Sequence, residues 1–205
     1  MITEKELKDK CMPLIQAGRY AEAKNIMQAY RLEKNDHWST GNVPLDLSNN
    51  LYMIQFLQHN KHPRLMALDQ ETYKYVFDLV AYALLRGSGT PRSSKMTNIP
   101  GMTIGTAAKV LMNYALTQLS LKEYRESDVV VSVNVTGGGQ PLCPNCQSVC
   151  GTYPKNAYVP MIPNPTCKNP EFCNLMYTAE TIGSPKAKGQ QKQTQKKKSI
   201  LDIFK

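Results

Sequence analysis

The central helix of this protein is predicted by the sequence Asp69-Gln-Glu-Thr-Tyr-Lys-Tyr-Val-Phe-Asp-Leu-Val-Ala-Tyr-Ala-Leu-Leu-Arg-Gly87. Apolar residues recur at helical spacing in its first half, and Leu79, Ala81 and Leu85 make its second half apolar on nearly every side. Asp69 is a favoured N-cap residue, and Arg86 with Gly87 supplies a basic last turn and a glycine C-cap. Because such a helix must be surrounded by others, the sequence predicts a helical bundle.

Similar patterns on both sides extend the predicted bundle over residues 3–126. Thr3 and Glu6 match a capping box at the start of the first helix. Cys11 lies on that helix and is expected in the core. Further helices are predicted at residues 20–32, at residues 48–58, and from Thr103 or Thr106 onward; loops are predicted at residues 35–44, which include Trp38, and at residues 87–101.

The character of the chain changes at residue 127. Residues 129–135 are dense in β-branched side chains and run into the turn Thr136-Gly-Gly-Gly139, which predicts a strand. The following residues are rich in proline, cysteine, asparagine and tyrosine. We therefore predict a mainly α fold, in which a helical bundle (1–126) precedes a small zinc-stabilised β-rich module (127–182) and a disordered basic tail (183–205).

The net charge of +9 on 205 residues is concentrated in that tail. Residues 183–205 hold seven lysines and one aspartate, which leaves a balance of only +3 for residues 1–182. A solvated spacer is one interpretation, and contact with nucleic-acid phosphates is the other, because bound lysines release counterions from the backbone. The predicted nucleic-acid contacts are Lys186, Lys188, Lys192, Lys196, Lys197 and Lys198.

Five of the six cysteines fall between residues 143 and 173. Cys143-Pro-Asn-Cys146 has the spacing that places two thiolates on one side of a tight turn, which suits two corners of a tetrahedral zinc site. No histidine lies in this segment, which argues against a mixed Cys/His site. The predicted ligands of one structural Zn²⁺ are Cys143, Cys146, Cys167 and Cys173, with Cys150 as the substitute. Buried free thiols and a redox pair are the alternatives.

The strand, the glycines and the Cys-x-x-Cys turn resemble the first half of a zinc ribbon. The second half departs from that pattern, because five residues separate Cys167 from Cys173 where a ribbon has two. His59 and His62 precede Pro63 and are expected to cap the end of a helix.

The last residues, Ile200-Leu-Asp-Ile-Phe204, follow the lysine-rich segment with four large apolar side chains. They resemble the pentapeptide that binds bacterial sliding clamps, with Ile200 in place of its glutamine. Residues 197–204 also resemble the peptide that binds eukaryotic, archaeal and some viral clamps, with Lys197 in place of the glutamine. The resemblance implies that Ile200, Leu201, Ile203 and Phe204 bind a clamp. A short helix folded back onto the protein is the alternative.

Together these features predict a non-enzymatic accessory factor of DNA replication or of clamp-coupled late transcription, with a virus or phage as one expected source. Its predicted partners are a sliding clamp, or another replication or transcription protein, and nucleic acid. An RNA- or virion-associated zinc protein is the alternative, and a nuclease using carboxylates such as Asp69, Glu71 and Asp78 is a further one. With no apolar run that would span a bilayer and no signal region, we expect an intracellular protein of the cytoplasm or nucleus, neither secreted nor membrane-bound.

Overall fold

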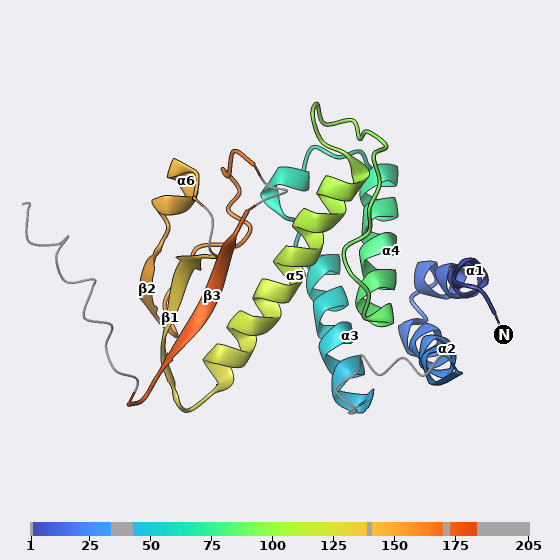
Figure 1. The fold of residues 1–205 in the computed structure, drawn as a ribbon, viewed down its shortest axis with the longest axis horizontal. Coiled ribbons are helices and arrows are strands. Elements are labelled where there is room, and N and C mark those ends of the chain that lie inside the picture. The colour runs from blue at the N-terminus through green and yellow to red at the C-terminus, as the bar shows by residue number, and fades with distance from the viewer. Residues whose placement is uncertain (1, 34–42, 139–140, 170–172, 184–205) are drawn as a thin grey trace, which may run out of the picture.

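One long helix separates a bundle of helices from a small sheet (Figure 1). The computed structural model describes residues 2–33, 43–138, 141–169 and 173–183. Their elements are α1 (Glu4–Gln16), α2 (Tyr20–Glu33), α3 (Val43–His59), a 3-10 turn (Pro63–Leu65), α4 (Gln70–Arg86), α5 (Ile104–Glu126), β1 (Val130–Gly137), α6 (Pro144–Gln147), β2 (Gly151–Pro154) and β3 (Leu175–Thr181). A helical bundle followed by a small β part is thus confirmed.

The predicted helix ends are confirmed where their side chains make specific caps. Thr3 and Glu6 form the capping box, with Glu6 N–H donating to the Thr3 hydroxyl at 3.2 Å. Asp69 accepts the N–H of Thr72 at 2.7 Å, and Gly87 ends α4 with φ of 65°. Of the two threonines proposed for α5, Thr103 is the cap and accepts the N–H of Thr106 at 3.0 Å.

The start of α3 differs from the sequence prediction. The helix begins at Val43 and includes Pro44, which we had assigned to a loop. Proline is accepted in the first turn of a helix because its missing N–H has no intrahelical partner there. Trp38 and the other residues of 34–42 lie outside the described part of the chain.

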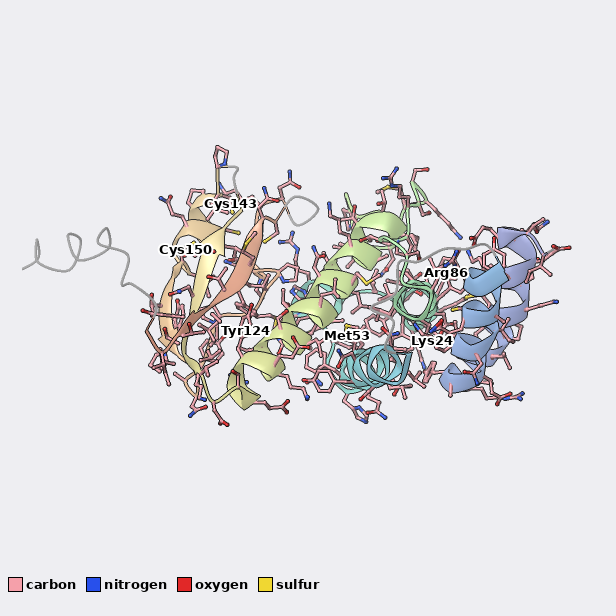
Figure 2. All side chains as sticks on the ribbon, turned by 60° about the horizontal axis from the view of Figure 1, so that its bottom comes forward. Lys24, Met53, Arg86, Tyr124, Cys143 and Cys150 are labelled. Atoms are coloured by element: carbon pink, nitrogen blue, oxygen red, sulfur yellow. The ribbon has the colours of Figure 1, made fainter. Side chains whose placement is uncertain are left out.

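Helix α4 is the centre of the bundle, as its sequence predicts. Val76, Val80 and Leu85 are fully buried, and the helix contacts α1, α2, α3 and α5. Lys24 of α2 is also buried and donates from Nζ to the carbonyl of Leu85 at 2.8 Å. Lys24 and Arg86 therefore lie where α4 meets the α1–α2 pair (Figure 2).

The sheet has the order β2-β1-β3 and is antiparallel throughout. Val133 of the central strand stands opposite Tyr153 of β2 and Ala179 of β3. Val133, together with Val135 of the same strand, is buried, and the side chains of this face pack against the last turns of α5. Within the described part of the chain, α5 thus covers one face of the sheet.

The buried residues form two clusters that share α5. Leu111 and Ala115 belong to the cluster within the bundle, whereas Leu121 belongs to the cluster beneath the sheet. The division predicted at residue 127 coincides with the end of α5, and the separation into two domains stays a prediction. Among the helices that the structure describes, none has both the length and the apolar composition for a bilayer crossing.

Candidate metal centre

The first two cysteines of the predicted site lie on a tight turn between β1 and β2. Cys143 precedes the one-turn helix α6, and the N–H groups of Cys146 and Gln147 both donate to its carbonyl at 2.9 Å. Pro144 fits the first helical position, where its missing N–H costs nothing. This turn places Cys143 and Cys146 on the same side, at the sheet end of the molecule, as the Cys-x-x-Cys spacing predicts (Figure 2).

The third and fourth cysteines come from the segment between β2 and β3. The sulfurs of Cys143, Cys146 and Cys167 all lie within 4.8 Å of one another. Cys143 Sγ is 3.9 Å from Cys167 Sγ, and Cys146 Sγ is 3.9 Å from Cys173 Sγ. The structure thus brings together the four cysteines that the sequence singled out.

These separations suit a tetrahedral metal ion. Zinc–sulfur bonds of about 2.3 Å place the sulfurs at the corners of a tetrahedron about 3.8 Å apart. Two of the six sulfur–sulfur separations are 3.9 Å and agree with this edge, whereas Cys173 stands outside the group of three sulfurs that lie within 4.8 Å of one another. A set of soft sulfur donors with no carboxylate favours zinc over magnesium or calcium, which prefer oxygen ligands.

The thiols of the cluster differ in their acidity. The N–H groups of Lys168 and Cys146 donate to the Cys143 sulfur and lower the pKa of that thiol to about 7. Burial raises the pKa of Cys146, and the neighbouring sulfurs Cys167 and Cys173 raise it further. Burial also raises the pKa of Cys167. All four groups can become thiolates together only when a cation offsets their mutual repulsion, which is the role that a bound metal would fill.

Cys150, the substitute ligand in the sequence prediction, is placed differently. Its side chain is exposed, and its thiol donates to the carbonyl of Cys146 at 3.4 Å. Cys150 and Cys173 both lie outside the group of three mutually close sulfurs. Cys150 lies on the sheet side of α5 (Figure 2), next to the turn that carries Cys146. Cys173 is the better fourth ligand, because its sulfur is 3.9 Å from the sulfur of Cys146.

Two asparagines join the cysteine turn to the segment that carries Cys167. Asn145 donates from its amide to the carbonyl of Thr166 at 2.7 Å. Asn164 is buried and donates to the carbonyl of Asn145 at 2.7 Å, while its oxygen accepts the N–H of Thr166 at 3.0 Å. These bonds fix the relative position of the two ligand segments. The sequence shows Asn145 only as a suitable turn residue, and it gives no signal for Asn164.

The helical bundle also holds the second ligand segment, through residues that the sequence analysis did not assign to the site. Arg64 donates from Nη1 to the carbonyl of Pro165 at 3.1 Å and to the carbonyl of Cys167. His62 was expected to cap a helix end, and it caps the start of the 3-10 turn Pro63–Leu65. It is also fully buried, and its Nε2 lies 2.9 Å from the carbonyl oxygen of Pro163. The other ring nitrogen, Nδ1, accepts the N–H of Arg64 at 3.2 Å, so the ring is neutral and Nε2–H donates.

Both histidines therefore contact a helix end, at two different helices, and His62 has further partners. His59 contacts the end of α3, with Nδ1 2.8 Å from the carbonyl oxygen of Gln55. His62 also packs edge-on against Tyr114 of α5, with 5.2 Å between ring centroids. Burial lowers the pKa of His62. Its partner Pro163 is distant in the sequence, so no local pattern could predict the contact.

The arginine contact predicts a measurable effect on metal affinity. Replacing Arg64 with Gln removes the donors that hold the backbone at Cys167, and we expect a loss of about 10–100-fold in zinc affinity, as for other groups that orient metal ligands. Competition with a chromophoric zinc chelator measures this.

Arg125→Gln is the matched control, because Arg125 also donates to backbone carbonyls, those of Lys155 and Ala157, away from the cysteine cluster. We expect it to retain the wild-type zinc affinity. Equal affinities for the two variants would show that Arg64 does not support the site.

The remaining predicted site residues lie outside the described part of the chain. These are the six lysines at 186, 188, 192, 196, 197 and 198 and the apolar residues Ile200, Leu201, Ile203 and Phe204. Of the carboxylates considered for a nuclease, Asp69 caps α4 and Asp78 is buried beside Lys74, with 2.8 Å between the charged atoms.

No family model matches this chain, and neither the curated proteins nor the solved structures gave a match.

Proposed function

We propose that this protein is a non-enzymatic, zinc-containing accessory factor that binds nucleic acid and a sliding clamp of DNA replication or late transcription. The observation that carries the metal part is a group of three cysteine sulfurs within 4.8 Å of one another, with the sulfur of Cys173 3.9 Å from that of Cys146. With all four positions taken by protein ligands, a bound zinc would have no open position for substrate or water. Such a closed site stabilises structure, so the zinc would hold the ligand segments against the sheet.

The nucleic-acid and clamp parts of the proposal depend on the tail. Strand β3 ends at Thr181, and the basic residues begin at Lys186. The zinc-held sheet would then anchor a segment in which six lysines contact phosphates and the last apolar residues bind the clamp. Binding through the tail would raise the local concentration of the protein at the clamp.

The clamp prediction is tested by Phe204→Ala in the full-length chain. Burying one large apolar side chain contributes about 1.5–3 kcal/mol, so we expect the affinity for the clamp to fall by about 10–100-fold. Lys205→Ala, one residue further on, is the control and should bind like the wild type. Surface plasmon resonance measures the binding of both variants to a bacterial sliding clamp and to a eukaryotic sliding clamp, which are immobilised on separate surfaces.

The outcomes separate the two functional classes. If the wild-type chain binds one of the two clamps and Phe204→Ala does not, the result supports the proposal of a clamp-binding accessory factor. If the chain binds neither clamp but does bind labelled RNA, the clamp role is wrong, and an RNA- or virion-associated protein is favoured. RNA and DNA binding are compared with the six tail lysines replaced by glutamine, which should abolish most of the salt-dependent affinity.

A further inference from the structure

A cavity of about 810 Å³ opens beside the first turns of α5, in the helical part of the protein. It is distinct from the sulfur cluster, and its walls come from the loop after α4 and from α5 itself. Two cationic side chains and several hydroxyl groups line it, among them Thr90, Arg92, Ser93, Ser94, Thr103 and Lys109. The volume falls within the range of about 300–1,000 Å³ that is typical of small-molecule sites.

The loop that forms one wall is fixed against the helix. The N–H groups of Ile104 and Gly105 donate to the carbonyls of Lys95 and Ser93, at 2.8 and 3.1 Å. A side chain at Gly105 would place its Cβ only 2.7 Å from the carbonyl oxygen of Ser93, so glycine allows this close approach. Met96 and Thr103 add an antiparallel bridge. The wall that carries Arg92 is therefore built by the fold before any ligand arrives.

The charged residues that line the cavity have one sign, among the residues that the structure describes. None of its lining residues is acidic, and the sequence contains no aspartate or glutamate from residue 79 to residue 122, whereas it contains Arg86, Arg92, Lys95, Lys109 and Lys122 there. The first amides of α5 are already bonded to loop carbonyls. The side chains of the cavity would therefore hold the ligand. Because the charged side chains among them are cationic, the ligand should be an anion.

We propose that this cavity binds a phosphate group. The Arg92 guanidinium offers paired N–H donors that match two phosphate oxygens, Lys109 supplies a second positive charge, and the serine and threonine hydroxyls donate to the remaining oxygens. No aromatic side chain lines the cavity, so it lacks a platform on which a base could stack. The phosphate, and not a base, is the group that the site recognises.

The phosphate can come from a nucleic-acid backbone or from a small phosphorylated compound. The first source rests on the proposed function, and the second does not. The test uses the full-length chain with the six tail lysines, 186, 188, 192, 196, 197 and 198, replaced by glutamine. Phosphate binding by the tail then does not obscure binding at the cavity. The probes are pyrophosphate, followed by calorimetry, and a labelled single-stranded DNA of about 20 nucleotides, followed by anisotropy.

Arg92→Gln combined with Lys109→Gln is the cavity variant. Lys5→Gln combined with Lys8→Gln is the control, because it removes the same charge from exposed positions of α1 that do not line the cavity. We expect the cavity variant to lose at least about 10-fold in pyrophosphate affinity, as the loss of charged hydrogen bonds implies, and the control to change less than about twofold. Thermal unfolding of each variant confirms that it is folded.

Each result decides the proposal. A parallel loss of DNA and pyrophosphate binding in the cavity variant supports a nucleic-acid source, and a loss of pyrophosphate binding alone supports a small phosphorylated compound. If the parent chain with its tail lysines intact binds no DNA and pyrophosphate still binds through the cavity, the proposed function fails and the phosphate site stands. Equal binding by the cavity and control variants, or no binding of either probe, overturns the site.

Discussion

Replacing Cys146 with serine, or removing the metal with a chelator, is expected to unfold the sheet end of the protein and leave the bundle helical. Cys146 is 1% exposed and belongs both to the sulfur group and to the apolar cluster beneath the sheet. Structural zinc contributes about 10 kcal/mol or more in small metal-binding peptides. Without the metal, only the small apolar cluster beneath the sheet would hold the ligand segments in place. The bundle keeps its own buried cluster and should retain its helices.

Calorimetry and circular dichroism measure this difference. We expect the unfolding temperature of the sheet end to fall by at least about 10 °C, since each 1 kcal/mol shifts a protein of this size by about 2–4 °C. Cys150→Ser is the matched control, because Cys150 is exposed and lies outside the group of close sulfurs. It should melt within a few degrees of the wild type. A Cys150→Ser variant as unstable as Cys146→Ser would make Cys150 a ligand, as the substitute assignment allowed.

Leu121→Ala is expected to destabilise the protein by about 2–5 kcal/mol, the usual cost of truncating a buried leucine. Leu121 is 4% exposed and is the residue of α5 that belongs to the cluster beneath the sheet. Its loss should therefore leave a cavity between the helix and the buried face of β1. The same variant should also bind zinc more weakly, because both ligand segments connect strands that pack on this helix.

Chemical denaturation and zinc competition measure the two effects. Leu116→Ala is the control on the same helix. Leu116 is 44% exposed, so its truncation should cost the protein little stability. Stability changes of similar size in the two variants would contradict the packing of the sheet on α5. A stability loss in Leu121→Ala without any change in zinc affinity would show that the helix and the metal centre are independent.

Local signals in the sequence predicted much of the bundle and the members of the cysteine cluster. The caps at Thr3, Asp69 and Gly87 depend on residues within a few positions, so their patterns are visible in the chain. The Cys-x-x-Cys turn is equally local. Cys167 and Cys173 were chosen as the second pair of ligands, and their sulfurs lie 3.9 Å from those of Cys143 and Cys146, respectively.

Contacts between distant segments could not be predicted. Arg64 and His62 reach carbonyls about a hundred positions away in the sequence, and nothing in their neighbourhood distinguishes them from surface residues. Strands β2 and β3 are short or weakly patterned, and their pairing with β1 becomes visible only in the folded chain. The early start of α3 at Val43 was missed because a proline was taken as a loop signal.

The central claim is that four cysteines bind one metal ion, and X-ray absorption at the zinc edge of the purified full-length protein tests it most directly. We predict one zinc per chain with a first shell of four sulfurs at about 2.3 Å. The Cys173→Ser variant should lose one of these sulfurs, whereas Cys150→Ser should keep all four. Protein that purifies folded without metal, or a zinc shell dominated by nitrogen or oxygen, would contradict the account.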